Sequence, residues 1–189
     1  IDLSNVANQP MISNDKNYIL TFNGEIYNYV ELRSVLESKG YSFSTKSDTE
    51  VFLNLYLEYG EAMLQLLDGM FAFAIWDNLE KKLFVARDRV GIKPLFYSIN
   101  NSRFVCASEI KAIVSIYEPA ELLDNQLNEL LMFRHVNGAN TLFKNIFRLL
   151  PGHYMIVTLP RDYQNKKMIE FERKNTKSLS YSKSERMVF

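Results

Sequence analysis

The residue types that could do chemistry gather in two short segments of the chain. In the first, Asn23 and Gly24 follow the β-branched and aromatic run 18–22, so that a side-chain amide and an unhindered backbone N–H stand next to each other. Two such donors suit an oxyanion hole, in which N–H groups lie about 3 Å from a developing negative charge. In the second, Asp48 stands at an expected helix start, where its carboxylate is placed to hold the ammonium group of a ligand.

Taken one at a time, these residues have ordinary structural explanations. Asn-Gly is a common turn because both residues tolerate positive φ. Asp is a favoured N-cap at the start of a helix. A turn is the better explanation of Asn23–Gly24 alone, and an N-cap is the better explanation of Asp48 alone. Only their combination with other segments favours a functional site.

The elements that must position these residues are helices and short strands. Strand 18–22 is predicted to end at Asn23–Gly24, and a helix follows from Asn28 to a cap at Gly40. A short strand is expected at 41–45, and then a helix that starts at 47–49 and ends near Gly60. The remaining predicted elements are a short helix at 62–67, strands at 70–76, 83–86, 96–99, 103–107 and 153–158, and helices at 108–113 and 124–133. Helices first and antiparallel hairpins afterwards predict an α+β layered domain.

The composition is that of a folded globular protein. Lys and Arg number 22, Asp and Glu number 22, and hydrophobic residues make up 47% of the 189 residues. Such a mixture excludes wholesale disorder and argues against a nucleic-acid binder that works through bulk charge. No apolar run approaches the roughly 18 residues that a membrane helix needs. Since no signal peptide stands at the start, we expect a cytoplasmic protein that uses neither nucleic acid nor a membrane.

The single cysteine, Cys106, excludes an internal disulfide and a multi-cysteine metal site. It lies in the apolar run 103–107, which indicates a buried core residue rather than a nucleophile. His135 and His153 are the two histidines, and we interpret both as surface or turn residues. We therefore expect no metal site in this chain.

Several segments form one ordered pattern along the chain. Besides 22–28, 46–50 and 86–97, they are Ile1-Asp2-Leu3-Ser4, Gln9-Pro10-Met11, 68–77, Ala107-Ser108-Glu109-Ile110-Lys111-Ala112 and, more weakly, 149–154. In this order they resemble the glutaminase domain of the glutamine-hydrolysing asparagine synthetases, which are class II glutamine amidotransferases.

The resemblance implies a fold and a chemistry. The fold would be the four-layer αββα sandwich of the N-terminal-nucleophile hydrolases, here lacking its first strand. In that family an N-terminal cysteine attacks the side-chain amide of glutamine, and its own α-amino group acts as the base. Asn23 and Gly24 match the oxyanion hole, and Asp48, with help from Glu25, matches the anchor for the glutamine α-amino group. The segment 87–94 would support the wall of the site with structural residues.

Two parts of that family are absent from the sequence. Residue 1 is Ile, so the nucleophilic cysteine and the arginine that would hold the glutamine α-carboxylate are not in the chain. No Ser-Gly-Gly pyrophosphate loop occurs either, so ATP and Mg²⁺ are expected only in a missing synthetase domain, and no cofactor is expected in this chain. We therefore expect a piece of a longer protein that is inactive by itself.

The expected partners and boundaries follow from the same resemblance. The substrate would be glutamine, with aspartate and ATP bound through the missing domain, and a homodimer stays open. Residues 1–117 would form the incomplete amidotransferase domain, 118–160 a connecting region, and 161–189 a basic linker or tail of net charge +4. Two alternatives remain: a truncated, non-catalytic scaffold or binding module, and a related amidotransferase that delivers ammonia to another acceptor, such as a sugar.

Overall fold

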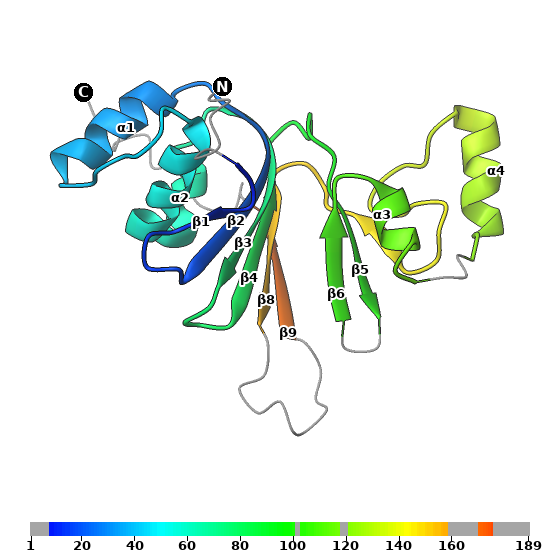
Figure 1. The fold of residues 1–189 in the computed structure, drawn as a ribbon. Helices are drawn as coiled ribbons and strands as arrows, with labels where there is room; N and C mark the ends of the chain where they lie inside the picture. The colour runs from blue at the N-terminus through cyan, green and yellow to red at the C-terminus, as the bar shows by residue number, and fades with distance from the viewer. Residues whose placement is uncertain (1–7, 101–102, 118–120, 159–169, 176–189) are drawn as a thin grey trace, which may run out of the picture.

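The structure, a computed structural model, describes residues 8–100, 103–117, 121–158 and 170–175. Across these residues the chain forms two antiparallel sheets that face each other, with helices on the outer side of each sheet (Figure 1). The order of layers is therefore helices, sheet, sheet, helices. This arrangement confirms the predicted α+β class and the αββα sandwich.

The larger sheet carries the segment with Asn23. Within the described residues it has six strands in the order β1 (Met11–Ile12), β2 (Tyr18–Ile26), β3 (Gly69–Asp77), β4 (Lys82–Arg87), β8 (His153–Thr158) and β9 (Glu170–Asn175). Strands β2 and β3 pair over their whole length, from Tyr18 opposite Asp77 to Ile26 opposite Gly69. This long ladder fixes the position of every residue on β2.

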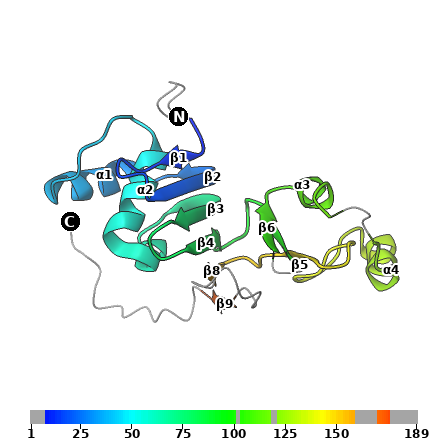
Figure 2. The same ribbon diagram turned by 60° about the horizontal axis from the view of Figure 1, so that its bottom comes forward.

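The smaller sheet faces the larger one. In the described part of the chain it has three strands in the order β6 (Arg103–Ala107), β5 (Phe96–Asn100) and β7 (Ile146–Arg148). Figure 2 shows this sheet set apart from β1–β4, so that the two sheets meet near β8 and diverge away from it. Strands β7 and β8 both come from the predicted connecting region 118–160, which therefore contributes to both sheets.

Helices cover the two outer faces. Helices α1 (Tyr29–Ser38) and α2 (Asp48–Tyr59), followed by the 3₁₀ helix η2 (Gly60–Gln65), lie on the larger sheet, whereas α3 (Ile110–Val114) packs on the smaller sheet and α4 (Asp124–Phe133) lies farther out (Figure 1). The N-cap of α2 is Ser47, whose side chain accepts a hydrogen bond from the N–H of Thr49. The predicted bounds of α4 and β8 are confirmed to the residue.

The main core is a cluster of aromatic rings between α2 and the larger sheet. The ring centroid of Phe52 lies 4.7 Å from that of Phe73 and 5.0 Å from that of Phe22. Strand β3 alternates between two environments: Phe71, Phe73 and Ile75 pack toward the helices, while Ala72 and Ala74 pack toward the smaller sheet. This confirms that strand 70–76 is covered on both faces.

Two local predictions are wrong. Strand β2 does not end at Asn23–Gly24 but continues to Ile26. Gly24 serves close approach rather than a turn, because a Cβ there would collide with the carbonyl oxygen of Met70 and stand 2.8 Å from the Cα of Phe71. The segment 41–45 is not a strand, and the hydrogen bonds that replace strand pairing there are described with the site below.

Three strands were not predicted. Strands β1 and β7 are too short to give a periodic pattern, with two and three residues. Strand β9 lies within the predicted tail 161–189 and pairs with β8 from His153 opposite Asn175 to Thr158 opposite Glu170. The rest of that tail lies outside the described residues, as does the opening segment 1–7, so the predicted domain boundaries stay predictions.

Candidate functional site

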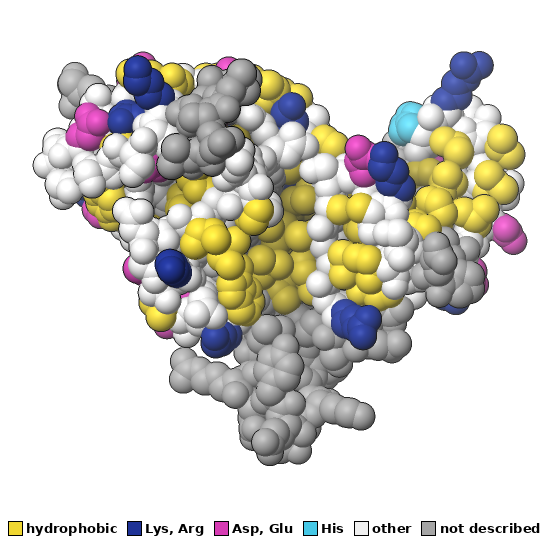
Figure 3. All heavy atoms as spheres, in the orientation of Figure 1, with side chains coloured by type: hydrophobic (Ala, Val, Ile, Leu, Met, Phe, Trp, Pro, Cys, Tyr) yellow, Lys and Arg dark blue, Asp and Glu magenta, His cyan; other side chains and the backbone are white. Residues whose placement is uncertain are grey.

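A hollow of about 300 Å³ lies between the two sheets. Its lining comes from both of them, namely Gln9, Thr21, Phe22, Asn23, Ala72, Phe73, Ala74, Leu95, Cys106, Ala107 and Ser108. Figure 3 shows apolar side chains inside the hollowed face between the two halves of the molecule. The small side chains of Ala72 and Ala74 leave room there for a ligand of limited size.

Asn23 brings an amide to the wall of this hollow. On β2, Phe22 packs into the aromatic core, so the next residue, Asn23, lies on the opposite face of the sheet. Its Nδ2 atom donates a hydrogen bond to Oγ of Ser108 at 3.1 Å. The side chain is half-buried, and its register is fixed by pairing with Ala72. The predicted oxyanion-hole amide is thus held at the junction of the two sheets.

Gly24 and Glu25 follow this amide on the same strand, and Asp48 is bonded to the end of that strand. Gly24 and Glu25 follow Asn23 on β2, and Glu25 is exposed. Asp48 is the first residue of α2, and its Oδ2 accepts a hydrogen bond from the N–H of Ile26 at 3.1 Å. Because Ser47 is the N-cap, the explanation of Asp48 as a simple cap is wrong. The structure therefore joins the four predicted site residues through one end of β2.

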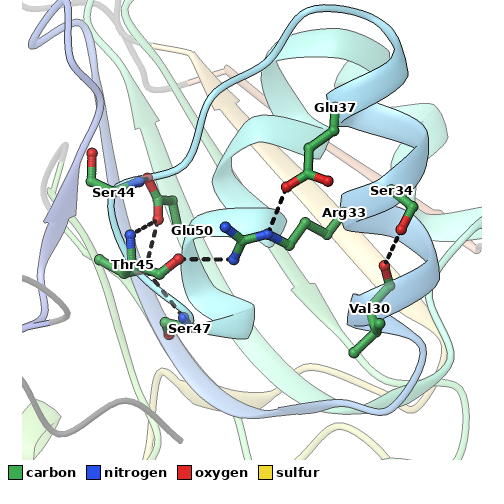
Figure 4. Close-up of polar contacts among 8 residues, drawn as sticks. All are labelled: Val30, Arg33, Ser34, Glu37, Ser44, Thr45, Ser47 and Glu50. Atoms are coloured by element: carbon green, nitrogen blue, oxygen red, sulfur yellow. Dashed lines mark hydrogen bonds and ion pairs between the residues drawn. The ribbon is translucent and has the colours of Figure 1, made fainter.

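The loop before α2 is held by side chains, which fixes where Asp48 stands (Figure 4). The Glu50 carboxylate accepts hydrogen bonds from the N–H groups of Ser44 at 2.8 Å and Thr45 at 2.7 Å. Nη1 of Arg33, from α1, donates to the carbonyl of Thr45 at 2.8 Å. These bonds satisfy backbone groups that a strand would otherwise pair, which explains why 41–45 is not a strand.

The segment 87–94 is a structural support beside the site. The Asp88 carboxylate accepts hydrogen bonds from backbone N–H groups of Phe71 and of residues 90–93. Burial alone would raise the pKa of Asp88, but these N–H groups bring it below its usual value. The buried Arg87 donates to the carbonyls of Gly91, Lys93 and Leu149. Both charged residues are thus used to hold the backbone.

Cys106 also lines the hollow, but its chemistry is that of a packed thiol. Burial raises the pKa of Cys106 to about 11, so the side chain is protonated at neutral pH. It packs against the apolar cluster between the sheets, but it is half-buried rather than fully buried as predicted. His135 lies in a bend after α4, where its Nδ1 contacts the carbonyl of Phe133. His153 is the first residue of β8, directly after a turn, and its Nδ1 contacts the carbonyl of Pro151.

Two residues of the site were missed by the sequence analysis. Ser108 accepts a hydrogen bond from Asn23, which is 85 residues away in the sequence. The Gln9 side chain accepts a hydrogen bond from the N–H of Phe22 at 2.6 Å. Both belong to motifs that carried the resemblance, but no local pattern shows such long-range contacts. Among the described residues, no three His, Cys, Asp or Glu side chains are grouped so as to hold a metal ion, and no helix is long and apolar enough to cross a membrane.

Comparisons with known proteins show the family of the chain. The profile of the glutamine amidotransferase domain family matches residues 1–168. The chain is 43% identical to asparagine synthetase [glutamine-hydrolyzing] 1 of Bacillus subtilis over 152 residues, which are 80% of this chain and 24% of that protein. It is 36% identical to amidase chyE of Penicillium rubens over 156 residues, 82% of this chain and 23% of that one. The chain thus spans about a quarter of the length of these curated relatives.

The fold has solved counterparts. The glutamine phosphoribosylpyrophosphate amidotransferase of Bacillus subtilis, solved with ADP and GMP, superposes with a TM-score of 0.56 over 87% of this chain and 31% of that chain, at 24% identity. At this identity the likeness concerns the fold alone, and it agrees with the predicted αββα sandwich. Together, these comparisons and the arrangement around β2 establish that the chain belongs to the glutamine amidotransferase domain family and is homologous to the glutaminase region of the glutamine-hydrolysing asparagine synthetases.

Proposed function

We propose that this chain is the glutaminase part of an ATP-dependent asparagine synthetase, which hydrolyses glutamine to glutamate and ammonia for the amidation of aspartate. The observation that carries the proposal is the placement of the Asn23 amide on the wall of the inter-sheet hollow, on the strand whose end is bonded to Asp48. The 43% identical relative supports the choice of asparagine synthesis.

Each site residue has a proposed part in this reaction. The Asn23 amide and the Gly24 N–H stabilise the negative charge that develops on the glutamine amide oxygen. Asp48, assisted by Glu25, holds the α-ammonium group of glutamine through charge-assisted hydrogen bonds. Cys106 is not the nucleophile, because its pKa of about 11 keeps it protonated and a mid-chain residue has no free α-amino group.

The remaining parts are proposed to lie outside this chain. A nucleophilic cysteine at the N-terminus of the full protein would attack glutamine, so the isolated chain is expected to be inactive. ATP and Mg²⁺ would bind a synthetase domain outside this chain.

The test uses the product of the complete gene and measures glutamate and ammonia released from glutamine. Asp48→Asn keeps the shape of the side chain but removes its charge, so KM for glutamine rises roughly 10- to 100-fold while kcat changes little. Asp124→Asn is the matched control, because Asp124 is likewise the first residue of a helix, α4. An unchanged KM in Asp48→Asn would contradict the assigned role.

A second candidate is an amidotransferase that delivers ammonia to a different acceptor. The observation that favours it is the 36% identity to amidase chyE. An assay of the complete gene product with glutamine, aspartate and ATP distinguishes the two candidate functions. Asparagine formation supports the first candidate, and glutamine hydrolysis without asparagine supports the second. A full-length protein that does not hydrolyse glutamine at all would instead be a non-catalytic scaffold.

A further inference from the structure

One hydrogen bond links the proposed oxyanion-hole residue to the opposite sheet. Nδ2 of Asn23 donates to Oγ of Ser108 at 3.1 Å. Asn23 belongs to β2 of the larger sheet, whereas Ser108 directly follows β6 of the smaller sheet. Both residues line the inter-sheet hollow. The bond therefore spans the junction at which a ligand in the hollow would lie.

This bond limits how the amide can turn. The last torsion of an Asn side chain is broad, so an unbonded carboxamide samples many orientations. Its nitrogen carries two N–H donors in one plane. When Ser108 accepts one of them, the direction of the second is fixed, and that donor is available for a ligand.

One end of the bond lies on paired backbone, and the other directly follows it. Asn23 lies opposite Ala72 in the β2–β3 ladder. Ser108 follows Ala107, which pairs with Phe96 of β5, and precedes Glu109, the N-cap residue of α3. Asn23 is held within one sheet and Ser108 between β6 and α3, so the bond relates the amide to both sheets.

We propose that Ser108 is a positioning residue of the oxyanion hole, which orients the Asn23 amide toward the amide oxygen of glutamine. This inference rests on the proposed function. Ser108 acts through Asn23 and not on the substrate itself. An oriented donor stabilises developing charge without reorganisation at the moment of reaction, so the effect of Ser108 falls on kcat rather than on substrate binding.

The experiment is a double-mutant cycle in the complete gene product, with glutamine hydrolysis as the readout. Ser108→Ala lowers kcat roughly 10-fold and changes KM by less than about 2-fold, because only the orientation of a donor is lost. Asn23→Ala lowers kcat roughly 100-fold or more. Adding Ser108→Ala to Asn23→Ala lowers kcat no further, because the amide that Ser108 orients is already gone.

Two variants control for structure. Ser108→Thr keeps the hydroxyl and restores most of kcat. Ser115→Ala removes another hydroxyl from the same region, one that is exposed and bonded only to the carbonyl of Ala112 among the described contacts, and leaves kcat unchanged. If Ser108→Ala does not fold, Ser108→Cys replaces it in the cycle, because a thiol is a weak hydrogen-bond acceptor.

The outcomes separate this inference from the proposed function. A wild-type protein that does not hydrolyse glutamine overturns both. An active wild type with an unchanged kcat in Ser108→Ala overturns the role of Ser108 and leaves the proposed function standing. The same holds if Ser108→Ala costs as much in the Asn23→Ala background as in the wild type.

Discussion

Helices α2 and α4 have similar lengths, 12 and 10 residues, but very different surroundings. Helix α2 buries six of its residues, among them Phe52 and Leu55, against the larger sheet. Helix α4 buries none, and Leu131, Met132 and Phe133 are 73%, 75% and 56% exposed. Figure 3 shows apolar side chains gathered on the surface over α4.

The contrast teaches where the stability of the molecule resides. Helices in proteins are stabilised mainly by the packing of an apolar face rather than by propensity. Helix α2 has that packing, and it carries Asp48 at its first residue. The larger sheet and its helices, which place Asp48, therefore also contain the larger buried cluster, whereas we expect α4 to add little to the free energy of folding.

The largest expected effect is that of Leu55→Ala in α2. Leu55 is fully buried, so its truncation removes apolar contacts and leaves a cavity, at a cost of about 2–5 kcal/mol in the free energy of unfolding. Urea denaturation of this chain, followed by circular dichroism, measures the loss. A cost below about 1 kcal/mol would show that α2 is not part of the cooperative core.

A smaller loss of stability is expected for a change at Asp88, which lies between β4 of the larger sheet and β5 of the smaller sheet. Asp88→Asn weakens the hydrogen bonds from the N–H groups of Phe71 and of residues 90–93, and we expect a loss of about 1.5–3 kcal/mol at pH 7. The pKa of Asp88 is lower in the folded protein than in the unfolded chain, where it is near 4. The carboxylate therefore stabilises the fold fully above the unfolded pKa, and this stabilisation is lost as the pH falls through the folded pKa.

Unfolding measured from pH 7 to pH 2 checks both parts of this prediction. The wild type loses stability below about pH 4, and Asp88→Asn shows a shallower decline in that range because it has no carboxylate to protonate there. Asp124→Asn, at an exposed carboxylate of α4, keeps the acid sensitivity of the wild type. An Asp88→Asn protein with wild-type stability at pH 7 would contradict the prediction.

The smallest effect is expected for Leu131→Ala in α4, which is the same chemical change as Leu55→Ala. The side chain is 73% exposed, so we expect a change within about 0.5 kcal/mol, measured by the same urea titration. A loss comparable to that of Leu55→Ala would remove the contrast between the two helices.

Local patterns predicted what depends on neighbours in sequence. The capping residues at 47–49 located the start of α2, and the spacing of Leu127, Leu130 and Leu131 predicted α4. The same patterns failed where distant residues decide. Asn23–Gly24 favours a turn locally, but the ladder with β3 keeps it extended.

Side-chain partners far along the chain explain the other failures. The backbone N–H and C=O of Thr45 are hydrogen-bonded to the side chains of Glu50 and Arg33, so they are not used for strand pairing. Ser108 and Gln9 form hydrogen bonds to residues of β2 that are 85 and 13 positions away in the sequence. Contacts of this kind produce no periodic sequence pattern. The roles of Asn23, Gly24, Glu25 and Asp48 came from resemblance and remain predictions, whereas their proximity is a property of the fold.

The alternation along β3 has a consequence for how such a domain can change. Phe71, Phe73 and Ile75 build the core, while Ala72 and Ala74, between them, set the room in the hollow. Because side chains on a strand alternate with a period of two, a shift of one position would exchange rings for methyl groups on both faces. Core and ligand space are thus encoded in alternate positions of one strand. An insertion or deletion there would disrupt both, whereas a substitution at 72 or 74 would change the hollow and the packing between the sheets but not the aromatic core against α2.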